Sequence, residues 1–418
     1  MTDRTPADAL VAACGAAAKE AAGPLARAEP TAIDAALRGM ADLLESAAGQ
    51  VLAANEADMT AARQAGIGGA LLDRLRLDQA RVADMARQLR ILAGTAHPPS
   101  STPLGELPGG LRLIERRRPV GVIGANFEAR PNLTLDIASQ LVKSGNAGVL
   151  RTGSAAARSA RALVDAVITP ALTAAGLPAA AIQLVPGADR ETAAALVRQP
   201  GLIPLVILRG SGEVTRTLGQ EAARHGVRTL AHADGGGVLY VHAGADLAKA
   251  QEIVERSVDR LGVCNRLNLL LVDEAIYERA LPELLATLEK AGIEPSLPPH
   301  DHPRGYEWAL DSERAATVTV DRAAGPAAAA GIANDETSGL AAGIVTEDRA
   351  AAEEFLATYT GTGAFWNATT RLLDGFKLLQ VPETGINIDR VPGPRGPVTF
   401  RDLYLRQYVV VPDGHGAG

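Results

Sequence analysis

The chain has 418 residues, of which 47% are hydrophobic, and it carries a formal net charge of −7 at pH 7. Its length predicts two or three structural units, and its negative charge argues against nucleic acid or an anionic membrane surface as a partner. Two cysteines cannot build a disulfide framework, the N-terminus has no basic-then-apolar leader pattern, and no apolar run reaches about 18 residues. We therefore expect a soluble, cytoplasmic protein with reduced thiols.

The first quarter of the chain is predicted to be helical. Residues 6–95 carry apolar side chains at helical spacing, for example at Leu37, Met40 and Leu44. The following stretch, 104–119, has Pro-Gly-Gly between two alternating runs, which predicts a two-stranded arm. The run at 404–411 is predicted to be a strand that could pair with this arm.

From residue 120 onwards, apolar runs alternate with helical segments. We expect strands at 120–125, 147–153, 182–187 and 205–211, and helices at 132–145, 154–176, 190–199 and 212–226. This alternation predicts a doubly wound parallel sheet, in which ligands bind at the carboxyl ends of the strands. The turns that should face one crevice are Ala125, Arg151–Ser154, Pro186–Gly187 and Arg209–Gly212. A second α/β alternation runs from about 257 to 388.

The expected crevice has no G-x-G-x-x-G fingerprint, so the motif alone does not identify a dinucleotide fold. Arg151 and Ser154 follow a strand and open a helix. An arginine with a hydroxyl, and without an acid, suits a ribose 2′-phosphate at such a turn. The simpler interpretation is a helix cap with an exposed arginine, and the residues taken alone favour it.

The loop "ANFEARPN" carries Glu128, Arg130 and Asn132 between a strand and a helix. Arginine can bind a carboxylate or phosphate through two hydrogen bonds, and Asn132 heads the helix. A helix cap with a surface ion pair explains the same residues equally well.

Two histidine patterns have simpler structural explanations. His232 and Asp234 in "HADGGG" could do acid–base chemistry, but three glycines more simply indicate a close backbone approach. His300 and His302 could share a metal, but the neighbouring prolines indicate a loop and a metal needs further ligands.

The two cysteines differ in their surroundings. Cys14 lies in an alanine-rich helix, where core packing is the expected role. Cys264 has polar neighbours and precedes the apolar run "LNLLLV". The residues alone leave Cys264 open between a nucleophile and a buried inert cysteine, with the second more common.

Several stretches carry a resemblance to a known family, in family order from about residue 100 to the C-terminus. They are "RPVGVIGANFEARPNLTLDIASQLVKSGNAGVLRTGSAA", "LRGSGEVTR", "VCNRLNLLLVD", "NATTRLLDGF" and "RGPVTFRDLYLRQYVVV". The chain resembles the γ-glutamyl phosphate reductase family, a branch of the aldehyde dehydrogenase superfamily. The resemblance implies an α/β, aldehyde-dehydrogenase-like fold with two doubly wound domains and a β-arm for oligomerisation. It implies an NADP-binding domain at 1–256 and 390–418 with the arm at about 104–119 and 404–411, and a catalytic cysteine domain at 257–389.

The resemblance also implies a reaction, the NADPH-dependent reduction of an acyl phosphate to the semialdehyde of proline biosynthesis. The first candidate substrate is L-glutamyl 5-phosphate. It implies Cys264 as the nucleophile that forms a thioester, with Asn132 as a donor to the oxyanion. The residues implied at NADP(H) are Arg151, Ser154, Arg209, Gly210, Ser211 and Glu383. Those implied at the substrate are Glu128, Arg130, Asn265 and Arg395, and no metal is implied. A homodimer or homotetramer is expected, with an amino-acid kinase as a functional partner.

The sequence departs from the family on the acyl side. Arg266 and Asn268 stand where the family usually has alanine and glutamate, and "GPRGP" lacks the family's histidine. The segment before Glu383 is glycine-rich in the family, whereas this chain has "LLQVPE" there. Two alternatives follow: a paralogue that reduces a different or modified acyl phosphate or oxidises an aldehyde, and a non-catalytic binding protein that retains the fold.

Overall fold

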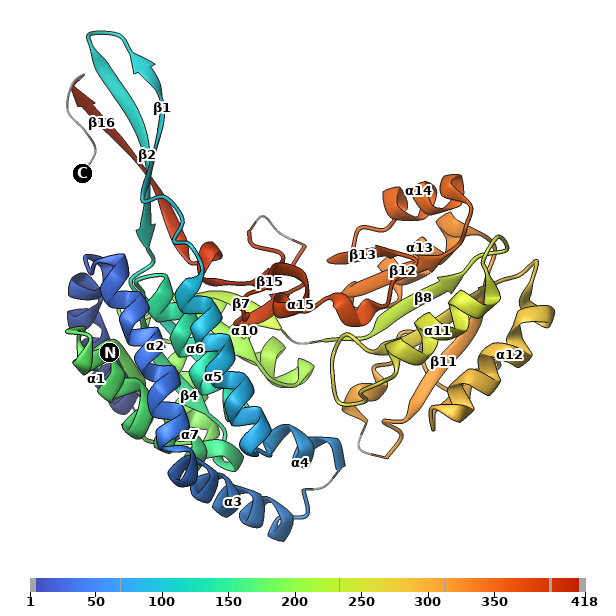
Figure 1. Cartoon of the computed structure of the whole chain (residues 1–418), viewed down its shortest axis with the longest axis horizontal. Coiled ribbons are helices and arrows are strands. Elements are labelled where there is room, and N and C mark those ends of the chain that lie inside the picture. The colour runs from blue at the N-terminus through green and yellow to red at the C-terminus, as the bar shows by residue number, and fades with distance from the viewer. Residues whose placement is uncertain (1–4, 68, 233, 312, 391–392, 413–418) are drawn as a thin grey trace.

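The computed structural model describes residues 5–412, apart from 68, 233, 312 and 391–392. Figure 1 shows two α/β bodies side by side, with a long β-arm that projects from the first of them. The predicted architecture of two α/β bodies with a β-arm is confirmed. Within the described part of the chain, no helix has the length and apolar character that a membrane crossing requires.

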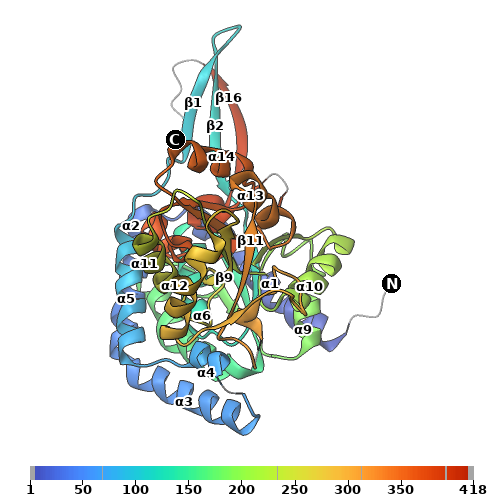
Figure 2. The same ribbon diagram turned by 90° about the vertical axis from the view of Figure 1, so that its right-hand side faces the viewer.

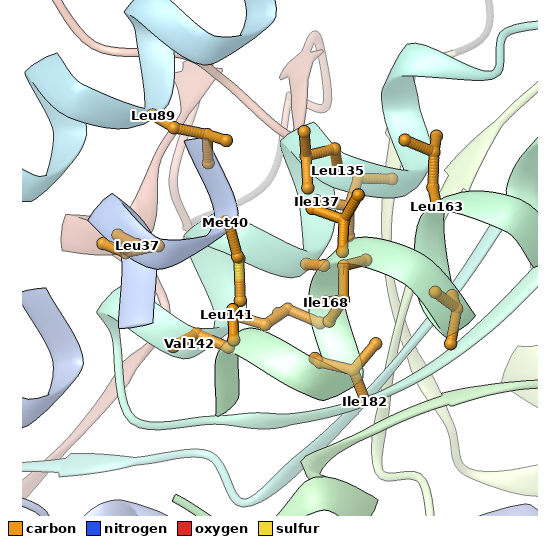
Figure 3. Packing of buried hydrophobic residues seen from close by; sticks show 14 of the residues in the cluster. Leu37, Met40, Leu89, Leu135, Ile137, Leu141, Val142, Leu163, Ile168 and Ile182 are labelled. Carbon is orange, nitrogen blue, oxygen red and sulfur yellow. The ribbon is translucent and has the colours of Figure 1, made fainter. Parts of the chain in front are cut away.

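The chain begins with the expected helical region. Its helices are α1 (Pro6–Ala26), α2 (Pro30–Ser46), α3 (Ala48–Gln64), α4 (Gly69–Leu75) and α5 (Gln79–Gly94). The helical spacing of Leu37, Met40 and Leu44 buries one face of α2 completely. Figure 3 shows Met40 beside Leu141, which lies in the helix that follows the first strand of the sheet.

The first body is built on a parallel sheet with the strand order β5-β4-β3-β6-β7. Its strands are β3 (Val122–Phe127), β4 (Ala147–Thr152), β5 (Ile182–Leu184), β6 (Leu205–Arg209) and β7 (Arg228–His232). The linking helices include α6 (Asn132–Lys143), α9 (Arg190–Leu196) and α10 (Gly212–His225). One core joins the sheet to α2, α5 and α6, and another joins it to α1, α9 and α10.

Two predictions for this body need correction. The helix expected at 154–176 is divided into η1 (Ser154–Ala156), α7 (Ala157–Leu163), η2 (Val164–Ile168) and α8 (Thr169–Ala174). Pro170 has no N–H to donate, and the π-turn η2 lies directly before its helix. His232, expected in a turn, ends strand β7, which was not predicted.

The second body has a six-stranded parallel sheet with the order β10-β11-β9-β8-β12-β13. Its strands are β8 (Gly237–Val241), β9 (Leu267–Asp273), β10 (Glu294–Ser296), β11 (Thr317–Ala323), β12 (Ala341–Val345) and β13 (Gly363–Trp366). Helices α11 (Leu247–Ser257) and α12 (Tyr277–Lys290) pack on one face, and α13 (Pro326–Asp335) and α14 (Arg349–Thr358) on the other. The predicted domain division stays a prediction; β8 and most of α11 precede residue 257 but pack in this second sheet.

The arm is a three-stranded antiparallel sheet of β1 (Ser101–Leu107), β2 (Leu111–Pro119) and β16 (Tyr404–Pro412). The prediction that the last strand pairs with the early hairpin is therefore confirmed. Gly109 and Gly110, with φ of 85° and 70°, make the hairpin turn that the Pro-Gly-Gly sequence predicted. Figure 2 shows the three strands rising together above the rest of the molecule.

The segment before β16 completes the core of the first body. Phe400 and Leu403 are fully buried in the same cluster as the residues of α2 and α6. The Phe400 N–H donates to Gln140 Oε1 at 2.6 Å, and Asn146 Nδ2 donates to the Leu403 carbonyl at 2.9 Å. Before this segment lie α15 (Gly375–Leu379), β14 (Gly385–Asn387) and β15 (Gly396–Val398).

Candidate active site

A cavity of about 510 Å³ is lined by both bodies. The start of α6 and the end of β6 line it from the first body, and the loop before β9 lines it from the second. Its lining is rich in charge, with the cations Arg74, Arg76, Arg81, Arg130, Arg209 and Arg260 and the acids Asp84, Asp136, Asp374 and Glu383. An excess of arginine over acidic side chains in a cavity favours an anionic ligand.

Cys264 directly follows Val263, which lines this cavity. Its backbone is fixed because its carbonyl accepts a hydrogen bond of 2.6 Å from the Gly236 N–H. Burial raises the pKa of the thiol to about 11, while the nearby guanidinium groups of Arg130 and Arg209 act to lower it. The thiol is therefore protonated at neutral pH, and its attack on a carbonyl would require a proton acceptor.

Arg130 and Arg209 both line the cavity, and the charge of each acts on the Cys264 thiol. Burial, together with the charges of Arg209 and Arg74, lowers the pKa of Arg130 to about 9. Arg209 is oriented by a hydrogen bond of 2.8 Å from Nη1 to the Thr384 carbonyl. Two cations that line the same cavity repel one another, and a bound anion would relieve that repulsion.

Two acids share the cavity with these cations. Asn132 Nδ2 donates to Asp136 Oδ2 at 2.8 Å. This hydrogen bond, between residues one helical turn apart, fixes the orientation of the Asn132 amide. Glu383 accepts a hydrogen bond from the Gly375 N–H. Burial raises the pKa of both Asp136 and Glu383 to about 7.

Glu128 lies between the ends of two strands of the first sheet. A Cβ on Gly210 would lie 3.6 Å from Glu128 Cδ, and one on Gly153 would lie 3.8 Å from Glu128 Cγ. Gly153 follows β4 and Gly210 follows β6, so the crevice expected from the sequence brings these turns together. Ser211 caps α10, where its Oγ accepts from the Val214 N–H at 3.4 Å, and Ser154 is exposed at the start of η1.

Arg151 points into the protein rather than into this crevice. Its side chain is buried, and Nη2 donates to the carbonyls of Ala188 and Asp189 at 2.7 and 2.6 Å. Nη1 donates to Asn126 Oδ1 at 3.0 Å. The exposed arginine of the simpler interpretation is therefore wrong, and the 2′-phosphate role stays a prediction that would require these bonds to open.

Comparison with known proteins identifies the chain's relatives. The model of the aldehyde dehydrogenase family matches residues 3–302. The chain belongs to the aldehyde dehydrogenase family. The γ-glutamyl phosphate reductase of Thermotoga maritima is similar to it with a TM-score of 0.88 and 27% identity, over 98% of this chain and 100% of that one.

Two further solved structures share the fold. The γ-glutamyl phosphate reductase of Saccharomyces cerevisiae matches with a TM-score of 0.53 and 24% identity, over 98% of each chain. An acetylating aldehyde dehydrogenase from Geobacillus thermoglucosidasius matches with a TM-score of 0.73 and 18% identity, again over 98% of each chain. The resemblance predicted from the sequence is confirmed, and these relatives support an oxidoreductase.

Within this family fold, the residues predicted for the acyl side divide into two groups. Arg130 and Asn132 line the cavity. Asn265 is buried and donates to the carbonyls of Arg371 and Leu373 at 3.3 and 2.9 Å. Arg395 is exposed and donates to the Thr360 carbonyl at 2.6 Å. Neither Asn265 nor Arg395 is among the described residues that line the cavity, and their substrate roles stay predictions.

The two family departures next to Cys264 are both buried and bonded to backbone. Arg266 donates from Nε to the Leu267 carbonyl at 3.0 Å, and its Nη atoms donate to the carbonyls of Ala315 and Thr317. Burial lowers the pKa of Arg266 to about 10. Asn268 is bonded to residues 306 and 308. These side chains fix the strand edges around the cysteine loop.

The histidine patterns have structural partners. His232 Nδ1 accepts from the Ile386 N–H at 2.8 Å, and burial keeps its pKa well below the usual value, so the ring is neutral. Asp234 instead pairs with Arg216 at 3.0 Å. His302 Nε2 lies 2.7 Å from Ser296 Oγ. Among the residues that the structure describes, no three His, Cys, Asp or Glu side chains could hold a metal ion.

Sequence reasoning missed three residues near the cysteine. Arg74 and Arg260 line the cavity, and Glu307 lies beside the cysteine loop. Arg74 and Glu307 come from segments whose sequences have no motif that points to chemistry. Asp136 was also missed, although its position four residues after Asn132 in a predicted helix places the two side chains on one face.

Proposed function

We propose that the protein reduces an acyl phosphate, with L-glutamyl 5-phosphate as the first candidate, to an aldehyde through a thioester on Cys264. The observation that carries this proposal is a cysteine directly after a residue of the cavity wall, with the charges of Arg130 and Arg209, which line the cavity, acting on its thiol. A thiol is the appropriate nucleophile because a thioester forms readily and accepts a hydride at its carbonyl carbon. The similarity to γ-glutamyl phosphate reductases supports the same reaction class.

The cavity residues divide the work of the first step. Arg130 and Arg209 neutralise the phosphate or carboxylate of the substrate, which places the acyl carbon beside Cys264. The Cys264 sulfur forms a bond to that carbon, and the C–O bond to phosphate breaks. Asn132 Nδ2, held by Asp136, is the proposed donor to the oxyanion that forms on the acyl oxygen.

The cofactor of this proposal is NADP(H), at the crevice between the ends of β4 and β6. The residues there fit a dinucleotide because Gly153 and Gly210 keep the turns small, and the N-terminus of α10 favours a phosphate. When bound, the cofactor supplies the hydride that converts the thioester to the aldehyde. Ser154, Ser211 and Glu383 are the proposed contacts. The preference for NADPH over NADH rests on Arg151 and Ser154 alone.

A second candidate is a paralogue that acts on a different or modified acyl phosphate, or that oxidises an aldehyde. It is favoured by Asn265 and Arg395, which are bonded to backbone carbonyls away from the cavity lining. We also propose a homodimer or homotetramer formed through the arm, and an amino-acid kinase that supplies the acyl phosphate.

The test is a screen of NADPH oxidation with the purified full-length chain. Glutamyl and aspartyl phosphates are generated in the assay, and the reverse reaction is run with the semialdehydes, inorganic phosphate and NADP⁺. We expect phosphate release and aldehyde formation that Cys264→Ala abolishes. An enzyme that uses none of these substrates in either direction would contradict the proposal, and glutamyl phosphate turnover weaker than that of another acyl phosphate would favour the paralogue.

A further inference from the structure

Glu307 and Cys264 approach the same glycine from different segments of the chain. A Cβ built on Gly235 would lie 2.6 Å from Glu307 Oε1 and 2.7 Å from Cys264 Cβ. Only a glycine fits between these two side chains, because any Cβ there would collide with both. The carboxyl group of Glu307 therefore lies close to Cys264, and Gly235 lies between the two side chains.

Asn268 holds the backbone on both sides of Glu307. Its Nδ2 donates to the Tyr306 carbonyl at 2.6 Å, and its Oδ1 accepts from the Trp308 N–H at 3.0 Å. Trp308 is buried, and its Nε1 donates to Thr319 Oγ1 at 3.0 Å. The residue that departs from the family pattern beside Cys264 thus fixes the position of Glu307 relative to that cysteine.

Arg74 ties the segment of Glu307 to the loop of Cys264. Its Nε donates to the Gly262 carbonyl at 2.9 Å, and its Nη2 lies 3.5 Å from the Ala309 carbonyl. Gly262 is two residues before Cys264, and Ala309 is two residues after Glu307. Because Arg74 comes from α4 of the first body, both reacting segments are positioned by one cation that also lines the cavity.

The charges around this pair decide its protonation. Burial raises the pKa of Glu307 to about 7, with Asp234 raising it further and a Gly235 hydrogen bond, Arg74 and Arg266 lowering it. The charged groups that act on Cys264 include Arg130, Arg209, Arg74, Glu383 and Glu307. Glu307 therefore exchanges a proton near neutral pH, where the thiol itself stays protonated.

We propose that Glu307 is the proton acceptor for the Cys264 thiol, acting through one water molecule. A single water is invoked because no direct hydrogen bond between the two side chains is found among the described residues. The inference rests on the proposed function and names a further catalytic residue for it. A carboxylate beside the thiol supplies the base that attack on an acyl phosphate requires at neutral pH.

The proton balance is as follows. As the S–C bond forms, the thiol proton passes to the Glu307 carboxylate, and the C–O bond breaks with its electron pair going to phosphate. Glu307 then gives this proton to the departing phosphate, which leaves as hydrogen phosphate. After the hydride has reached the thioester carbon, the C–S bond breaks and the thiolate leaves with that electron pair. The thiolate regains a proton that Glu307 takes from solvent.

The first test needs no substrate. Alkylation of Cys264 by iodoacetamide is followed from pH 5 to 11 in a Cys14→Ala background, with adduct formation measured by mass spectrometry. We expect two inflections in the wild-type rate, because a coupled carboxyl and thiol titrate as a pair. Glu307→Gln should show one inflection, moved to lower pH, because a neutral amide no longer disfavours the thiolate. The exposed variant Glu313→Gln, the control, should keep both.

The second test uses the acyl phosphate substrate of the proposed function. At pH 7, Glu307→Gln should lower kcat/KM about 100-fold, which is typical for loss of a general base. The loss should shrink as pH rises and the thiol ionises unaided, whereas a merely structural defect would persist. The exposed neighbour variant Glu313→Gln should behave like the wild type.

The outcomes separate the two proposals. A wild-type protein that reduces no acyl phosphate but shows the two inflections, one lost in Glu307→Gln, overturns the proposed function and keeps the proton coupling. Normal turnover by Glu307→Gln at pH 7, or an alkylation profile like that of the wild type, overturns the role of Glu307.

Discussion

A pair of buried arginines and a pair of half-buried arginines serve opposite purposes. Arg151 in β4 and Arg266 before β9 each donate to backbone carbonyls inside the protein. Arg130 and Arg209 both line the cavity, where the positive charges are not neutralised by a paired carboxylate among the described residues. The first pair stabilises the fold through hydrogen bonds to the backbone. The second pair carries an unfavourable electrostatic free energy that a bound anion removes. An arginine at the end of a strand therefore does not reveal its role by its position in the sequence.

The largest expected effect that distinguishes the two pairs is that of Arg130→Met on activity. We expect kcat/KM to fall about 10²- to 10³-fold, about 3–4 kcal/mol, because a charged donor to the substrate is lost. Stability should rise at pH 7, since Arg130 has a pKa lowered to about 9 and its charge costs free energy below that pH. Steady-state kinetics and thermal unfolding check the two effects, and Arg130→Lys is the charge-conserving control. An equally active Arg130→Met would remove the proposed anion site.

Arg266→Met should behave in the opposite way. Three carbonyls would lose their donor inside the protein, so we expect the free energy of unfolding to fall by about 3 kcal/mol. Denaturant unfolding measures this loss, and the surviving folded fraction should keep the KM of the wild type. A variant of full stability with an altered KM would place Arg266 in the substrate site after all.

Arg151→Met tests whether Arg151 belongs with the structural pair or binds the cofactor. If the contacts to Ala188 and Asp189 are its main role, stability should fall by about 2 kcal/mol and the KM values for NADPH and NADH should change by the same factor. If Arg151 turns outward to a 2′-phosphate, the KM for NADPH alone should rise. Parallel titrations with both cofactors decide between these results.

The smallest expected effect is the pH dependence of stability that arises from two acids in the cavity. Asp136 and Glu383 have pKa values raised to about 7, so their stabilising contribution is complete below about pH 4 and is lost as the pH rises through 7. We expect unfolding at pH 8 to be easier than at pH 5, by on the order of 1 kcal/mol per group. Thermal unfolding of Asp136→Asn should show a smaller pH dependence than the wild type, whereas an unchanged dependence would argue against these pKa shifts.

The sequence predicted most elements correctly because apolar periodicity and glycine turns act locally. The helical region, the strand–helix alternation and the arm depend on such patterns, and the arm's third strand was found from one apolar run. Strand β7 was missed because "RTLAH" has too few apolar residues to mark a strand. It is stabilised by pairing with β6, a contact between distant residues.

The site was predictable where a residue's neighbours in sequence are also its neighbours in space. The cavity is lined by Arg130 just before α6, Asn132 at the start of α6 and Arg209 at the end of β6. The roles predicted for these residues stay predictions. The direction of Arg151 depends on carbonyls almost 40 residues away, so no local pattern predicts it. Glu307 reaches the cysteine only because Asn268 and Arg74 hold its segment, and these contacts join three separate parts of the chain.

Because Phe400 and Leu403 fill the core of the first body, that body cannot finish folding on the ribosome until nearly the whole chain has been made. At about 5–20 residues per second, the nascent chain waits roughly 10 to 35 s after the first sheet has been made. During this interval the hairpin of β1 and β2 also has a free edge, which only β16 covers. Between synthesis of its first sheet and of its last strand, we therefore expect the chain to expose apolar surface and an unpaired strand edge, the features that favour aggregation.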